Sequence, residues 1–276
     1  MSDTFHLQRF GRYFRFDITR MWRNNTKTAV LLGCGSIITV LICGIGGLLF
    51  NMHWFPATDP FRFFGFIICL GILELLMAKT YGFVTDRKEG SDYLMLPASL
   101  LEKWLSMMLV CLVVIPVLFL VTYFIVDGFV CAILPSTGTP LYQWAYESIG
   151  VANEKFNELN AFLHAQQVPL QYSIGSIIVP GIVSACCNYL FFLLCGLLFK
   201  RHKILNAIVV MMVVTSVFSL LAPHILPDLA AQLDGMDEVE AMTFTDSFFR
   251  IITLITGLIA ALLAAGCYLR LRKIAH

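Results

Sequence analysis

Long runs of apolar residues dominate the chain, and short polar segments separate them. A helix needs about 20 apolar residues to cross a hydrocarbon core of about 30 Å. Six runs meet this length, at 29–50, 61–84, 106–126, 173–199, 204–222 and 249–269. They lack the short alternating pattern of a membrane β-barrel, and glycine and proline within them are tolerated in lipid. The sequence therefore predicts an all-α, polytopic membrane protein with six transmembrane helices over residues 29–276.

Composition supports this interpretation. Of the 276 residues, 58% are hydrophobic and 13% are charged, roughly half the charged fraction of a soluble domain. This balance argues against a soluble enzyme, a disordered chain and a nucleic-acid-binding protein. The nine cysteines show no CxxC or Cys/His spacing, so we expect neither a disulfide framework nor a metal site.

Basic residues predict the orientation. Six lie before the first expected span, and three lie in each of the two inner loops and in the C-terminal tail, which makes fifteen of the 19 lysines and arginines. The loops on the opposite side contain only Lys155. By the positive-inside rule, both termini face the cytoplasm, as an even number of spans also requires.

Residues 1–28 predict an amphipathic helix ahead of the first span. Between residues 4 and 23, aromatic and aliphatic side chains share one helical stripe, and arginines flank it. We expect this helix to lie in the membrane interface, with its stripe among acyl chains and its arginines on lipid phosphates. A contact with a cytoplasmic partner is the alternative. The candidate interface residues are Arg9, Phe10, Arg12, Phe14 and Trp22.

The cytoplasmic segment 85–105 contains a charged turn at 86–89, an apolar tetrad at 93–96 and the capped start of a short helix. Ser99 and Glu102 have the spacing of a capping box. An apolar patch flanked by charge is typical of a docking site for another protein, although a plain re-entry loop is the alternative. The candidate partner-binding residues are Asp86, Arg87, Lys88, Glu89, Tyr93, Leu94, Met95, Leu96 and Glu102.

Two segments are expected on the outer side. Residues 127–172 predict a cap with an amphipathic helix at 141–165, and residues 223–248 predict an acidic loop. The acidic loop could attract a cationic ligand, but the positive-inside rule alone predicts the same asymmetry.

Glu74 is the one carboxylate expected deep within a span, where an unpaired charge costs several kcal/mol. Lys79 follows on the same helix and can reach the cytoplasmic interface. We expect Glu74 to hold a polar partner, with a substrate or proton role as the alternative. The chain has no HExxH, GxSxG or GxxxxGK[ST] motif, so we expect no catalytic residue and no nucleotide site of its own.

This layout resembles the permease subunit of ABC-2 type ABC transporters, in the short six-span bacterial form. The similarity in motif lies in the stretch from Asp86-Arg87-Lys88-Glu89-Gly90 to Leu96-Pro97-Ala98-Ser99 with Glu102-Lys103. The resemblance implies that residues 4–23 are a connector (elbow) helix and that 86–103 supply the coupling helix, which sits in a separate ATPase subunit.

The same resemblance implies an exporter of a hydrophobic or amphipathic substrate in the inner membrane of a bacterium. Two permease copies, as a homodimer or heterodimer, would assemble with ABC-type ATPase subunits that bind ATP and Mg. The chain itself would carry no cofactor. Two other hypotheses stay open: a non-transporting membrane scaffold or sensor, and an ion-coupled secondary transporter that uses Glu74.

Overall fold

The computed structural model describes residues 5–21, 27–50, 58–85, 90, 93, 95–134, 138–165, 172–234 and 236–275. Within these residues the regular structure is entirely helical. The α-helices are α1 (Leu7–Met21), α2 (Lys27–Gly33), α3 (Gly35–Phe50), α4 (Thr58–Thr80), α6 (Leu100–Leu109), α7 (Ile115–Ile133), α8 (Leu141–Ala165), α9 (Gly175–Leu198), α10 (Lys203–Asp234) and α11 (Glu238–Ala275). A 3-10 helix spans Gly82–Thr85, and a π-helical turn spans Val110–Val114.

Five helical stretches are long and apolar enough to cross a membrane, as the apolar runs predict. They are Phe61–Thr85, Leu100–Ile133, Gly175–Leu198, Lys203–Leu220 and Glu240–Ile274. The chain is therefore a multi-pass membrane protein by the length and composition of its helices.

The remaining expected span, 29–50, the first along the chain, is divided. A turn at Cys34 separates α2, of seven residues, from α3, of 16 residues. The glycines on either side of this turn allow close approach to neighbouring helices: a Cβ on Gly33 would lie 2.3 Å from Thr122 Oγ1, and one on Gly35 would lie 2.3 Å from Cys69 Sγ. The break therefore lies where α2 and α3 pack against α7 and α4.

Two expected boundaries differ from the structure. The predicted helix at Ser99 and the span expected at 106–126 form one helical stretch, Leu100–Ile133, of 34 residues. Its π-helical turn directly precedes Pro116, whose ring and missing N–H disturb regular α-helical bonding. The segment 223–248 is not a loop, because α10 continues to Asp234 and α11 begins at Glu238.

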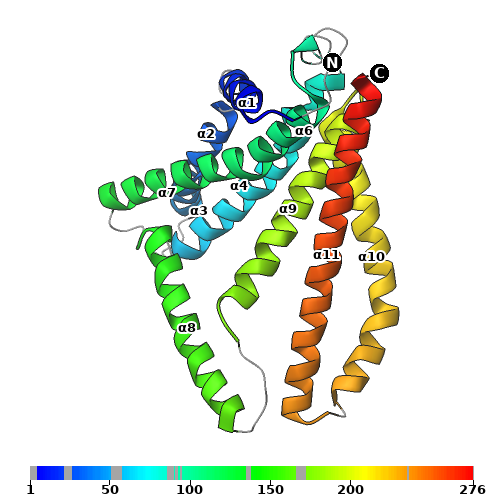
Figure 1. The fold of residues 1–276 in the computed structure, drawn as a ribbon. Coiled ribbons are helices and arrows are strands. Elements are labelled where there is room, and N and C mark those ends of the chain that lie inside the picture. Colours follow the sequence, from blue (N-terminus) through cyan, green and yellow to red (C-terminus); the bar gives the residue numbers. More distant parts are fainter. Residues whose placement is uncertain are drawn as a thin grey trace.

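Figure 1 shows how these helices are arranged. The first described residues, the turn between α9 and α10, and the end of α11 lie at one end of the molecule, which we call the N/C end. The connection between α10 and α11 and the lower end of α8 lie at the opposite end, the far end. The view looks nearly along α1, whereas α9, α10 and α11 run down the picture, so α1 lies crosswise to them.

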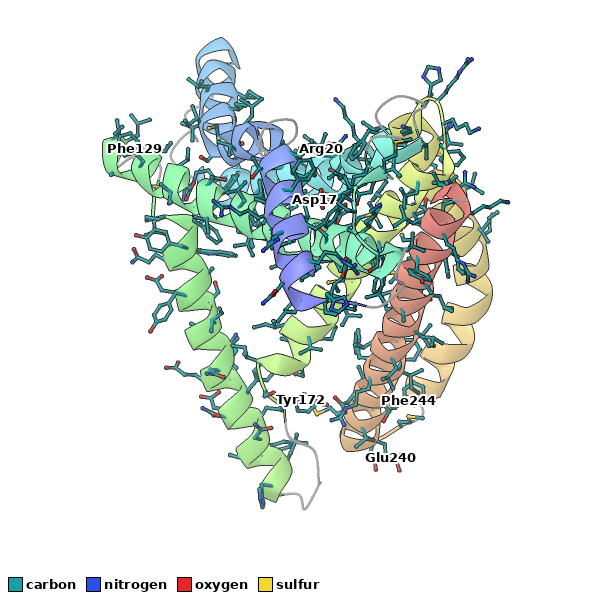
Figure 2. All side chains as sticks on the ribbon, turned by 45° about the horizontal axis from the view of Figure 1, so that its top comes forward. Asp17, Arg20, Phe129, Tyr172, Glu240 and Phe244 are labelled. Carbon is teal, nitrogen blue, oxygen red and sulfur yellow. The ribbon has the colours of Figure 1, made fainter. Side chains whose placement is uncertain are left out.

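The core lies between α4, the α6–α7 stretch and α9, and α11 packs against α9. Met77, Met107, Phe119 and Leu193 are among its fully buried side chains. The outward faces of α10 and α11 are exposed and apolar, as faces toward lipid would be. Toward the far end, Tyr172, three residues before α9, contacts α11, because its hydroxyl donates to the Met242 carbonyl at 3.3 Å (Figure 2).

A close helix crossing joins α4 and α9. A Cβ placed on Gly196 of α9 would lie 2.1 Å from the Ala78 backbone oxygen. Ala78 belongs to the small-residue pair Ala78/Gly82 of the second expected span, and a small residue allows this approach.

We predict that Gly196→Ala separates α4 from α9 and destabilises the protein by about 1–3 kcal/mol, the usual cost of overpacking. Gly181→Ala is the matched control, because the same added carbon on the same helix meets nothing within 4 Å. Equilibrium unfolding in mixed micelles measures both. Equal stability of the two variants would contradict the close crossing.

Candidate functional site

Helix α1 docks through a stripe of polar side chains at the N/C end. Arg9, Tyr13, Asp17 and Arg20 recur at helical spacing, so they lie on one side of α1. Tyr13 and Asp17 are buried. Figure 2 shows Asp17 and Arg20 where α1 crosses the helices behind it. The contacts of these four residues define the candidate site.

Arg9 binds the first turn of α6. Its Nε donates to Glu102 Oε2 at 2.8 Å, and its second terminal nitrogen donates to Glu102 Oε1 at 2.8 Å. The backbone N–H of His6 also donates to Glu102 Oε1, at 2.9 Å. Paired hydrogen bonds of this kind fix both distance and orientation. Hydrogen bonding to Glu102 also raises the pKa of Arg9 above its usual value.

Glu102 also caps α6. The Ser99 hydroxyl accepts a bond from the Glu102 backbone N–H at 3.3 Å, and the Glu102 carboxylate accepts one from the Ser99 N–H at 2.9 Å. The capping box read from the sequence is confirmed. The Glu102 side chain is fully buried beneath α1, so in this conformation it serves the chain's own contacts and is not on a surface that a partner can reach.

Asp17 forms the second contact. Its Oδ2 accepts a hydrogen bond from the Tyr81 hydroxyl at 2.7 Å and another from the Ser106 hydroxyl at 2.5 Å. Burial raises the pKa of Asp17, and these two hydrogen bonds act in the opposite direction. A buried carboxyl whose pKa is raised favours its protonated form, so protonation of Asp17 strengthens the docked state of α1.

Arg20 and Tyr13 complete the contact through aromatic rings. The Arg20 guanidinium lies 4.1 Å from the ring centroid of Phe83 and 5.7 Å from that of Tyr93. The Tyr13 and Tyr93 rings meet edge to face at 6.2 Å. Tyr93 is therefore held in the protein interior and is not part of an exposed patch.

The other residues of the expected docking segment have mixed positions. Met95 is 78% exposed, whereas Leu96 is half-buried. Asp86, Arg87, Lys88, Glu89 and Leu94 lie outside the described residues. Among the described residues of the apolar tetrad, Tyr93, Met95 and Leu96, the most exposed side chain is that of Met95.

The apolar stripe of α1 does not face lipid alone. Phe14 and Ile18 pack against the chain's own core, and Phe10, half-buried, stacks on Phe14 at 5.7 Å. Arg12 is exposed on the other side of the helix, and Trp22 lies outside the described residues. The expectation that the apolar stripe lies among acyl chains is thus wrong for Phe14. The polar contacts of α1 hold the helix against α6, so Phe14 faces the protein.

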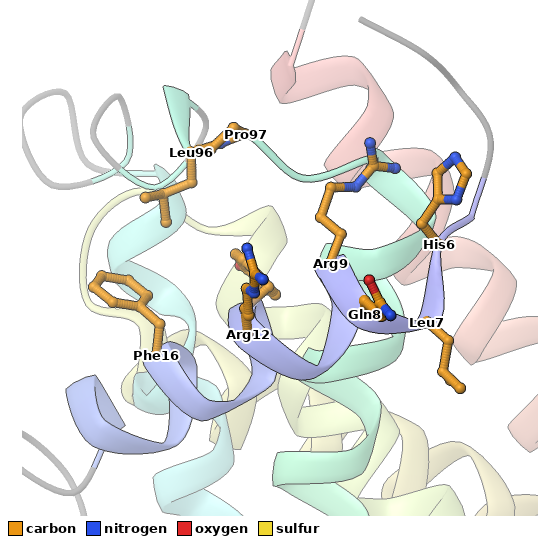
Figure 3. A pocket seen from close by; sticks show the side chains of 9 residues that line it. His6, Leu7, Gln8, Arg9, Arg12, Phe16, Leu96 and Pro97 are labelled. Carbon is orange, nitrogen blue, oxygen red and sulfur yellow. The ribbon is translucent and has the colours of Figure 1, made fainter.

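A groove runs along α1 at the N/C end. It has a volume of about 680 Å³ and lies between α1 and the Leu96–Pro97 segment (Figure 3). Its lining residues are His6, Leu7, Gln8, Arg9, Arg12, Tyr13, Phe16, Leu96 and Pro97.

Glu74 contacts a neighbouring span. Asn188 Nδ2 on α9 donates to Glu74 Oε1 at 3.4 Å, and Glu74 is half-buried. Lys79 is exposed on the same helix. The structure brings Glu74 and Asn188 together and leaves Lys79 apart from them.

A buried ion pair between α4 and α7 was not predicted from the sequence. Arg62 and Asp127 are 1% and 0% exposed, and their charged groups lie 3.7 Å apart. Arg62 also donates to the Cys131 sulfur and to the Thr139 carbonyl. Asp127 Oδ2 accepts the Leu141 N–H at 2.8 Å, which fixes the start of α8.

A signal for this pair was present in the sequence. Arg62 lies one residue inside an expected span, and Asp127 lies one residue beyond another. Hydropathy treats such residues as boundary markers and does not show that they meet.

The described residues contain no group of three or more His, Cys, Asp or Glu side chains that could hold a metal ion. The site as described is a mechanical connection. It joins α1, the segment around Tyr93 and the first turn of a long membrane-spanning helix.

Comparison with protein-family models, curated proteins and solved structures gave no match for this chain.

We predict that Glu102→Gln loosens α1, because it removes the charge that Arg9 binds. The unfolding temperature falls by roughly 3–6 °C, and trypsin cleaves faster within α1. Glu158→Gln is the matched control, since Glu158 is exposed on α8. Identical behaviour of the two variants in purified protein would refute the role of Glu102 in docking.

We predict that Asp127→Ala destabilises the chain by about 3–5 kcal/mol, because it leaves the buried Arg62 charge without its carboxylate. The double variant Arg62→Met/Asp127→Leu recovers most of this loss. Asp246→Ala is the control, since Asp246 pairs with the largely exposed Arg250 at 2.7 Å, and its loss costs about 1 kcal/mol or less. Unfolding in mixed micelles gives all three values, and a loss no larger than that of the control would contradict the assignment.

Proposed function

We propose that this chain is the permease subunit of an ATP-driven ABC-2 type exporter. In this proposal it has six spans, with α2 and α3 together forming the first, and both termini face the cytoplasm of a bacterium. A separate ATPase binds ATP and Mg at the N/C end. A second permease copy completes the path for a hydrophobic or amphipathic substrate.

The observation that carries the proposal is the attachment of the segment around Tyr93 to one continuous helix. Met95 in this segment is exposed. Tyr93, two residues earlier, packs against Tyr13 of α1, and Arg9 of α1 is hydrogen-bonded to Glu102. From Leu100 the helix continues to Ile133, a length of about 50 Å. A push on Met95 would therefore pass along a stiff element to Ile133, beyond which the chain continues to α8.

The distribution of charge supports the orientation. Basic residues within α1, in the turn between α9 and α10 and at the end of α11 lie toward the N/C end. The positive-inside rule favours the cytoplasm for that end. A cytoplasmic ATPase would then have access to Met95.

The polar contacts favour a mechanical drive over an ion-coupled one. Asn188 is the side chain that hydrogen-bonds Glu74 among the described residues, and a proton relay needs several ionisable groups at successive depths. Loss of transport in Glu74→Gln, together with a response to a proton gradient, would favour the ion-coupled alternative. Absence of substrate-dependent turnover with any ATPase would favour a scaffold or sensor.

We predict that the tagged full chain, purified from its native membrane, carries a bound ATPase and that Met95→Asp lowers the bound amount at least about tenfold, because a charge replaces an exposed apolar anchor. Tyr146→Asp is the matched control, because Tyr146 on α8 is also 78% exposed but lies outside the N/C end. ATP hydrolysis and mass spectrometry of the purified complex measure the bound subunit.

Two results would contradict different parts of this proposal. If no ATPase accompanies the wild-type chain, the exporter assignment is overturned. If Met95→Asp retains the ATPase as well as Tyr146→Asp does, the docking assignment is overturned and the exporter assignment stands.

A further inference from the structure

The groove between α1 and Leu96–Pro97 combines positive charge with apolar walls. None of its nine lining residues is acidic. Figure 3 shows Arg9 and Arg12 rising from the same side of α1, with Phe16 toward one end of the groove and His6 and Leu7 toward the other.

The two arginines have different roles. Arg9 is committed to Glu102, and 30% of its side chain remains exposed. Arg12 is exposed and makes no ion pair with the part of the chain that the structure describes. Its guanidinium therefore supplies the groove's positive charge, and the chemistry that fits is an oxyanion bound through charge-assisted hydrogen bonds.

The apolar lining narrows the class of anion. Leu7 is 75% exposed and Phe16 is 48% exposed, although both are large apolar side chains. A free phosphate ion would gain no binding energy from these apolar side chains. A phospholipid has a phosphate and acyl chains in one molecule, so it satisfies both the arginine and the apolar walls.

The position of the groove fits the same ligand. α1 packs on α6, at the start of the membrane-spanning stretch Leu100–Ile133, and it lies crosswise to α9, α10 and α11 (Figure 1). A helix in this position lies near the level of lipid headgroups. Exposed apolar side chains next to arginines are stable at that level, whereas in bulk water they would be a liability.

We propose that this groove binds the headgroup of an anionic phospholipid. Arg12 pairs with the phosphate, and Leu7 and Phe16 contact the first carbons of the acyl chains. The bound lipid would cover the outer side of α1, and the polar stripe of α1 holds the inner side against the protein. This inference requires only a membrane location and stands apart from the ATP-driven mechanism.

Lipid titration of the purified full chain, followed by native mass spectrometry, tests the proposal. The probes are phosphatidylglycerol and phosphatidylcholine of the same acyl chains. We expect phosphatidylglycerol to be retained in preference, and Arg12→Gln to weaken its binding about five- to tenfold. Arg15→Gln is the matched control, because Arg15 is exposed on α1 but does not line the groove, and it changes binding less than twofold.

A second variant and two competitors separate the possible occupants. Phe16→Ser weakens phosphatidylglycerol binding but leaves any direct binding of inorganic phosphate unchanged. Inorganic phosphate that displaces the lipid at comparable concentration would assign the groove to a free anion and overturn the proposal. An acidic peptide that binds in Arg12-dependent fashion, with no preference between the two lipids, would assign it to a protein partner and also overturn it. Equal effects of Arg12→Gln and Arg15→Gln would leave only general surface attraction, contrary to a defined site.

Discussion

The bond between Arg9 and the buried Glu102 is the interaction on which the N/C end depends. One carboxylate caps α6, accepts the paired bonds of Arg9 and accepts the N–H of His6. These contacts join a crosswise helix to the first turn of the 34-residue helical stretch Leu100–Ile133. Asp17 repeats the arrangement two turns along α1, where it accepts bonds from Tyr81 and Ser106. Because both carboxylates are buried, neither contact can be exchanged for water without cost.

Through this connection, a force on the segment around Tyr93 would act on the helix bundle. Tyr93 is enclosed by aromatic rings and the Arg20 guanidinium, whereas Met95 projects outward. A segment that is buried at Tyr93 and exposed at Met95 can transmit a force from a partner into the helix bundle. Toward the Ile133 end of the α6–α7 stretch, Arg62 and Asp127 hold α4, α7 and the start of α8 together. The two polar connections lie near opposite ends of the α6–α7 stretch, so that stretch is braced where it would receive a push and where it would deliver one.

Much of the fold could be predicted because it is local. Apolar runs gave five of the long helices, and the spacing of Ser99 and Glu102 gave the start of α6. The boundary at 223–248 was wrong because hydropathy reports the apolar length of a segment and not the end of its helix. The orientation of α1 could not be predicted: its apolar and polar stripes run side by side, and periodicity does not say which one meets protein. Arg62 and Asp127 are far apart in the sequence, and only the packing of α4 on α7 brings them together.

The central claim is that a separate ATPase subunit binds the chain at Met95. Photo-crosslinking from a benzoylphenylalanine at position 95, in intact cells that express the full chain, tests it most directly. The account predicts a covalent adduct with a nucleotide-binding subunit, identified by mass spectrometry, whose yield changes when ATP is depleted. Adducts with lipid alone, or with other parts of the same chain, would contradict it.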